Sequence, residues 1–291
     1  MELIAEVFLD TALDLLKLLP FLFLTYLLME YLEHRASLGT EKLLGASGKA
    51  GPLAGALLGV FPQCGFSASA AGLYSGGIIS AGTLAAVFLS TSDEMLPILI
   101  PRAVGSGGFG VIWKILAVKV LSAVALGFGV DIFLKLTRRK VRKNVSGLCE
   151  HEHCHCDKGI LRSALSHTLK IGAFIAAVTL AMNFAVALIG EDALGSLLTG
   201  RPFLGPVLAA LVGLIPNCAA SVVITELGLS GVLSAGATVG GLMTGSGVGL
   251  LVLFRTNRPM KENALFALFL FAAGAICGVL LDLGGFTLTA G

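Results

Sequence analysis

The chain has 291 residues, of which only 13% are charged and 56% are hydrophobic, and its mean hydropathy is +0.92. Soluble domains carry about 25% charged residues, so this composition excludes most water-soluble enzymes. A net charge of +2 provides no basic surface for nucleic acid. The 38 glycines among so many apolar residues are typical of helical, polytopic membrane proteins.

The first apolar segment is expected to be a retained transmembrane helix. Its flank carries Glu2, Glu6 and Asp10, where a signal peptide would need positive charge. Six apolar runs are long enough to cross a hydrocarbon core of about 30 Å. They lie at about 8–32, 79–100, 109–134, 163–189, 232–254 and 263–283.

Four shorter apolar segments occur as two pairs, and a proline separates the members of each pair. They lie at about 51–61, 65–77, 204–215 and 219–231. The separating residues are Pro62 and Pro216, and proline removes a backbone donor and breaks a helix. Each segment covers only about half to two-thirds of the hydrocarbon core. Spacing alone therefore allows ten crossings, or six crossings and two re-entrant hairpins.

Lysine and arginine are concentrated in three loops, which hold 14 of the 20 basic residues and lie at 33–50, 135–162 and 255–262. The positive-inside rule places these loops in the cytoplasm and both termini outside. This assignment requires an odd number of crossings in each half, so the two halves have opposite orientations.

An internal repeat defines the two halves. A shift of 154 residues aligns 51–99 with 205–253 without a gap and gives 16 identities in 49 positions. Inverted repeats with interrupted helices at matching positions are typical of secondary transporters, whose substrate site lies near the midplane. We predict an all-α membrane protein of two inverted repeats, each of about five transmembrane segments, at 1–135 and 162–291. A cytoplasmic basic and His/Cys-rich linker at 136–161 joins them.

Cys64 and Cys218 follow the two proline breaks at matching positions. Thiolates bind soft or borderline cations and thiophilic arsenite, so we predict that these cysteines line the substrate site with the amides of Gln63 and Asn217. Two alternatives stay open. Cysteine is also a common apolar filler, and the amides could satisfy backbone groups that the prolines leave unbonded.

Ser92, Asp93 and Glu94 lie inside an apolar run, and the matching stretch of the second half has no carboxylate. A carboxylate at a helix centre costs about 3 kcal/mol, so these acids are predicted to bind a divalent cation or a coupling proton. The alternative is a structural ion pair with a helical lysine such as Lys114 or Lys119.

Asp14 and His167 correspond at a shift of 153 residues, in the first apolar run of each half. Histidine titrates near neutral pH, so we predict a coupling or auxiliary role for this pair, with solvation at the membrane interface as the alternative. Asn183 and Glu226 are further polar candidates in apolar segments.

The central loop is dense in nitrogen and sulfur donors that suit Zn²⁺ or a similar ion. The predicted ligands are Cys149, His151, His153, Cys154, His155 and Cys156. No fixed C-x2-C spacing is present, which indicates a tract that collects or senses metal in the cytoplasm and favours export.

Several of these features together resemble the ten-helix heavy-metal exporters. They are the run from Pro62 to Ser67, the Ser90-to-Glu94 stretch, Pro216-Asn217-Cys218 and the His/Cys-rich loop. Members of that family are described as arsenic efflux proteins or manganese transporters and are distantly similar to the arsenical permeases. The resemblance covers essentially the whole chain and implies ten crossings and efflux of a metal or metalloid.

The expected function is a secondary-active exporter of Mn²⁺, Zn²⁺, a similar divalent cation or arsenite, in the cytoplasmic membrane. We expect no enzymatic activity, no tightly bound cofactor and no nucleic acid; the partners are membrane lipid, the transported ion and a candidate coupling proton. No G-x4-G-K-[ST] motif is present, so energy would come from an ion gradient or a partner. The oligomeric state is open, with a homodimer as one candidate. The alternatives are a carrier of an organic or anionic solute, a membrane-embedded metal-dependent enzyme, and a metal sensor.

Overall fold

The computed structural model describes residues 50–62, 64–92, 95–106, 109–137, 160–189, 204–258 and 260–288, and 8–27 in part. Every regular element in these ranges is an α-helix, which confirms the helical class. Five described stretches are long and apolar enough to cross a membrane: Ala81–Ile100, Phe109–Leu136, Ala164–Ala181, Ala235–Thr256 and Met260–Leu283. They correspond to five of the six expected runs.

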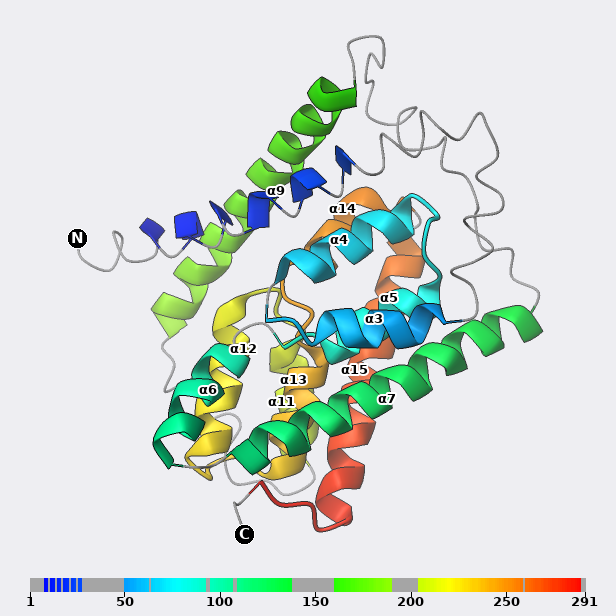
Figure 1. Ribbon diagram of the computed structural model, residues 1–291. Helices are drawn as coiled ribbons and strands as arrows, with labels where there is room; N and C mark the ends of the chain where they lie inside the picture. Colours follow the sequence, from blue (N-terminus) through cyan, green and yellow to red (C-terminus); the bar gives the residue numbers. More distant parts are fainter. Residues whose placement is uncertain are drawn as a thin grey trace.

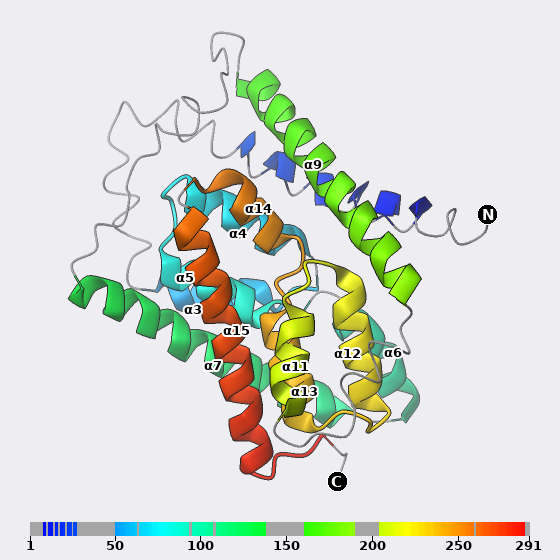
Figure 2. The ribbon, with the colours of Figure 1, turned by 180° about the vertical axis from the view of Figure 1, so that it is seen from behind.

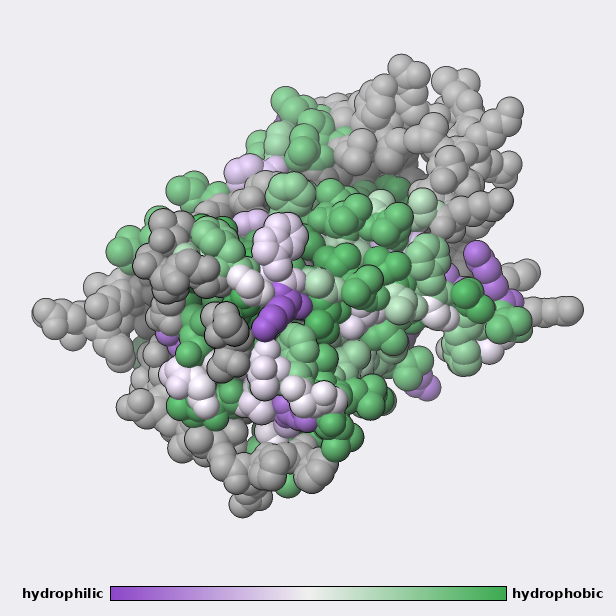
Figure 3. All heavy atoms as spheres, turned by 60° about the horizontal axis from the view of Figure 1, so that its bottom comes forward, coloured by the Kyte–Doolittle hydropathy of each residue, from purple (hydrophilic) through white to green (hydrophobic). Residues whose placement is uncertain are grey.

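Three of these stretches belong to long continuous helices, α7 (Phe109–Leu136), α9 (Ile160–Ile189) and α15 (Met260–Leu283). The membrane-length windows of α7 and α15 are only 28% buried. Large apolar side chains cover their outer surfaces, and Trp113 on α7 is 71% exposed. Figure 3 shows a face on which apolar residues predominate. Such a surface is compatible with contact to lipid.

The other two stretches are each divided into two helices by a non-helical segment. Helix α5 (Ala81–Ser90) is followed by α6 (Met95–Ser106), and α13 (Ala235–Thr244) is followed by α14 (Gly249–Thr256). Their windows are 81% and 89% buried, so the interrupted helices form the interior.

Backbone and hydroxyl chemistry accounts for both interruptions, which the hydropathy of the sequence does not reveal. The Ser90 hydroxyl donates to Ala86 O at 2.8 Å and the Thr91 hydroxyl to Val87 O at 2.7 Å, and such back-bonding competes with regular helix. In the second half, Gly247 has φ 52°, a conformation that glycine adopts without steric cost.

Four short helices complete the two halves. They are α3 (Gly51–Gly59), α4 (Cys64–Ser75), α11 (Leu204–Gly213) and α12 (Cys218–Leu229). The expected breaks at Pro62 and Pro216 are confirmed, because α3 and α11 end before these prolines and α4 and α12 begin after them. At the shift of 154 residues, α4 and α12 have the same bounds, and so do α5 and α13.

The helices of the two halves pack in matching pairs. Helices α3, α5 and α7 contact one another, and α11, α13 and α15 do the same. Helix α4 packs mainly on α14 of the other half, whereas α12 contacts α13 and α11 of its own half as well as α6 of the other (Figures 1 and 2). The sequence repeat is therefore accompanied by a repeat of tertiary contacts.

A carboxylate of each outer helix binds the start of an inner helix. Asp131 on α7 accepts hydrogen bonds from Ser80 Oγ at 2.8 Å and Gly82 N at 2.9 Å. Asp282 on α15 accepts from Ser234 Oγ at 2.6 Å and Gly236 N at 2.7 Å. These bonds satisfy amide groups that have no partner within the helix at an N-terminus.

The described part of the N-terminal segment, within residues 8–27, runs beside α9 (Figures 1 and 2). Tyr26 stacks on His167 with ring centroids 5.6 Å apart, and Leu18 and Leu22 are fully buried. The first apolar runs of the two halves are thus neighbours.

Candidate functional site

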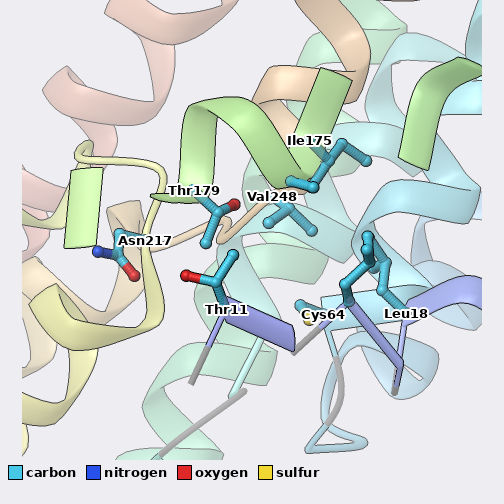
Figure 4. A pocket seen from close by; sticks show the side chains of 9 residues that line it. Thr11, Leu18, Cys64, Ile175, Thr179, Asn217 and Val248 are labelled. Atoms are coloured by element: carbon cyan, nitrogen blue, oxygen red, sulfur yellow. The ribbon is translucent and has the colours of Figure 1, made fainter. Parts of the chain in front are cut away.

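The two proline breaks lie beside one small cavity, shown in Figure 4. Its lining comes from the N-terminal segment, α9, the two breaks and the interruption between α13 and α14. The lining residues are Thr11, Leu15, Leu18, Cys64, Ile175, Ala176, Thr179, Asn217 and Val248. The enclosed space suits roughly one water molecule or a small ion.

Cys64 and Asn217, two of the predicted site residues, meet at this cavity although they belong to different halves of the chain. Asn217 corresponds to Gln63 in the repeat, and Cys64 corresponds to Cys218. The cavity is therefore lined from both halves at equivalent helix breaks.

The Cys64 thiol is free and half-buried at the first position of α4. The carbonyl oxygen of the same residue accepts a hydrogen bond from Ser67 Oγ at 2.8 Å, which fixes the first turn of the helix. A partly accessible thiol can act as a soft ligand once it is deprotonated.

Asn217 is 3% exposed and is the N-cap of α12. Its Oδ1 accepts from Ala219 N at 3.2 Å, so this amide satisfies backbone near the break, as the alternative interpretation of the residue expects. Capping and lining are compatible, because the Asn217 side chain borders the cavity from this position (Figure 4).

Thr11 and Thr179 line the cavity and were not among the predicted site residues. Thr179 is 5% exposed, and its Oγ1 has no hydrogen-bond partner within the described part of the chain. A buried hydroxyl without a partner costs about 1–3 kcal/mol, so this oxygen is suited to a ligand or water in the cavity. A single threonine in an apolar helix gives no sequence signal.

Three other predicted residues lie away from the cavity lining. His167 is buried against Tyr26 and lies eight residues, about 12 Å, along α9 from Ile175. Ser92 is buried in the interruption after α5, where its Oγ donates to Ser90 O at 3.0 Å. Glu226 is half-buried near the other end of α12 from the cavity. The auxiliary roles of His167 and Glu226 and the ion-binding role of Ser92 stay predictions.

The remaining predicted residues lie outside the described positions or have side chains outside them: Asp14, Gln63, Asp93, Glu94, Cys149, His151, His153, Cys154, His155, Cys156, Asn183 and Cys218. Within the described residues, no three His, Cys, Asp or Glu side chains form a group that could hold a metal ion.

The two lysines considered as ion-pair partners occupy different environments on α7. Lys114 is exposed, whereas Lys119 is fully buried. A buried lysine in an apolar helix is uncommon and needs polar partners.

No protein-family profile, curated protein or solved structure matches this chain. Over the residues that the structure describes, the fold defines a class: a helical protein with five stretches long and apolar enough to cross a membrane.

Proposed function

We propose that this chain is a secondary-active transporter that exports a metal or metalloid ion across the cytoplasmic membrane by alternating access. The observation that carries the proposal is the cavity lined by Cys64 and Asn217 at equivalent breaks of the two halves. Breaks of this kind are where secondary transporters bind their substrates.

In the proposed architecture, six crossings and two re-entrant hairpins make up the two inverted repeats. Helix α3 has nine residues and α4 has 12, which correspond to about 13 and 18 Å, too short for a core of about 30 Å. In Figure 1 both helices extend to the same side of the break, so the chain reverses its direction there. The α11–α12 pair has the same pattern, and the positive-inside rule places its open end on the opposite face.

The lining favours a thiophilic solute. One thiol, two threonine hydroxyls and an amide oxygen border the cavity, and no carboxylate is among its described lining residues. Arsenite combines thiol affinity with hydroxyl groups that hydrogen-bond to such partners. A harder cation such as Mn²⁺ would depend on Asp93 and Glu94, because carboxylate oxygens suit hard cations.

Transport into vesicles that hold the purified protein in inverted orientation tests the proposal. Purified protein would be reconstituted, and uptake of arsenite, Mn²⁺, Zn²⁺ and Co²⁺ would be compared for the wild type, Cys64→Ser and Asp93→Asn. Cys277→Ser is the matched control, since Cys277 is the other free thiol of the described residues and does not line the cavity. Loss of uptake in Cys64→Ser alone supports the thiol site, and loss in Asp93→Asn supports the acid site. Unchanged uptake of every ion in both variants contradicts the site.

A carrier of an organic or anionic solute is the second candidate. In a binding assay, competition by small organic anions but not by metal salts or arsenite would favour this carrier over the exporter.

A further inference from the structure

Lys119 connects the interrupted helices of both halves. Its side chain is 0% exposed on α7. Its Nζ donates a hydrogen bond to the carbonyl oxygen of Thr91, the C-cap residue of α5, and another to that of Leu242, in the last turn of α13, at 2.9 Å. One ammonium group therefore bonds to the C-terminal ends of two helices, one from each half of the chain. Along the sequence, Lys119 lies 28 residues from Thr91 and 123 residues from Leu242.

These carbonyls are at positions where a helix leaves its acceptors unsatisfied. The last four carbonyls of an α-helix have no intrahelical donor, and the C-terminus carries a partial charge of about −0.5. Helices α5 and α13 contact each other, and α7 contacts both. Two negative helix ends therefore converge beside α7, in an interior where water is scarce.

The repeat explains why a single lysine serves both ends. The matching pairs Gly127 with Gly278 and Asp131 with Asp282 relate α7 to α15 by 151 residues. At this shift Lys119 corresponds to Leu270, which is also 0% exposed. A second ammonium in the same interior would repel the first, so one charge at the junction of the halves is the favourable arrangement.

We propose that the Lys119 ammonium is a tethered cation in a site formed by the C-terminal ends of α5 and α13. In secondary transporters, unwound carbonyls and half-helix C-termini coordinate Na⁺ or protons, and here the protein supplies the positive charge itself. Removing the side chain opens a site for a small monovalent cation of ammonium size. This inference does not depend on which solute the protein carries.

Chemical rescue of Lys119→Ala tests the site. The melting temperature of the purified protein in detergent would be measured with methylammonium chloride or, at equal concentration, tetramethylammonium chloride. We expect the variant to melt several degrees below the wild type and to be restored by methylammonium, which can donate to both carbonyls, but not by tetramethylammonium, which has no N–H donor. The wild type should respond equally to the two salts. The absence of any selective rescue by methylammonium, ammonium, Na⁺ or K⁺ contradicts the proposal.

Lys119→Met decides the question if the alanine variant does not fold. Methionine fills a similar volume without charge, so the proposal predicts a lower melting temperature and no rescue by methylammonium. Leu270→Met is the matched control at the equivalent position and should melt within about a degree of the wild type, since Leu-to-Met changes are tolerated best in a core. A Lys119→Met variant as stable as the wild type overturns the proposal. Because the readout is stability, these results are separate from any failure of transport.

Discussion

Asp131 and Asp282 occupy equivalent positions, and each accepts two hydrogen bonds from the start of an inner helix. Gly82 and Gly236 make this geometry possible, because a Cβ atom at either position would overlap the carbonyl oxygen of Gly127 or Gly278. A carboxylate near the positive end of a helix is stabilised by the dipole as well as by the bonds. We infer that these acids have a structural role.

Replacing either carboxylate by an amide should lower stability. In Asp131→Asn, one oxygen becomes an NH₂ group, which cannot accept a hydrogen bond, so the bonds from Ser80 Oγ and Gly82 N cannot both be kept. The expected cost is about 1 kcal/mol, seen as a melting temperature lower by a few degrees. Asp131→Asn and Ser80→Ala should be non-additive because they remove one shared bond. Asp131→Asn and Ser234→Ala should be additive, and strong coupling in that second pair would argue against two separate caps.

The Cys64 thiol provides a direct probe of the cavity. We expect N-ethylmaleimide to inhibit transport by alkylating Cys64, since the adduct would fill a cavity that holds about one water molecule. The transported ion should slow this alkylation when measured by mass spectrometry, while Cys277 on α15 should react at the same rate with or without the ion. Equal protection of both thiols would indicate a global conformational effect.

At the scale of the elements, the short helices decide between ten crossings and two re-entrant hairpins. Phe61, at the tip between α3 and α4, is the informative position. In a background without the six native cysteines, Phe61→Cys should resist a bulky maleimide-polyethylene glycol from both faces of the membrane, because a hairpin tip lies at the midplane. Thr287→Cys, after α15, is the control and should react from the outer face. Modification of Phe61→Cys from the outer face would establish a full crossing.

Proline breaks could be predicted from the sequence, whereas the interruptions of α5 and α13 could not. Pro62 and Pro216 break the helix through their own missing N–H group, so their effect can be predicted from the residue type alone. The interruption after Ser90 instead depends on which hydroxyls bond back to the helix and on Lys119, whose contacts come from a distant segment. The hydropathy of the sequence shows a continuous apolar run through the interruption after α5 and through the one after α13.

The candidate site could likewise be predicted only in part. Cys64 and Asn217 stand out because the repeat places them at equivalent breaks. Thr11 and Thr179 depend on how the N-terminal segment and α9 pack over those breaks, which one sequence does not encode as a pattern. The two aspartates carried a signal that the 154-residue shift missed, since Gly-x3-Asp recurs at 151 residues, at Gly127-x3-Asp131 and Gly278-x3-Asp282.

At the scale of the whole molecule, each half contributes to the packing of the other. Helix α4 packs mainly on α14 of the other half, and α12 contacts α6 of the other half in addition to α11 and α13 of its own. A movement of one half therefore displaces a hairpin that lies against the other half. This arrangement is suited to the rocking of one repeat against another that alternating access requires.

The His/Cys-rich central loop should raise the apparent affinity for the transported ion without being required for transport itself. Deleting 149–157 removes its six predicted ligands, so we expect a higher half-saturating ion concentration with an unchanged maximal rate in vesicles. The control for loop length is a variant in which serine replaces the three histidines and three cysteines, because it removes the same ligands without shortening the loop. Complete loss of transport in both variants would favour the metal sensor over the exporter.

A cation fixed inside the protein also bears on the energy source. If Lys119 permanently supplies the charge between α5 and α13, the transport cycle has no need for an alkali cation at that place. Wild-type transport should then be unchanged when Na⁺ in the buffer is replaced by K⁺ or choline at constant ionic strength. In Lys119→Ala, the junction is open to small cations, and residual transport should become dependent on which one is present. Because choline is too large for an ammonium-sized site and donates no N–H bond, it should give the lowest rate in that variant. A wild-type protein that already requires Na⁺ would show that the coupling cation binds elsewhere and that Lys119 does not replace it.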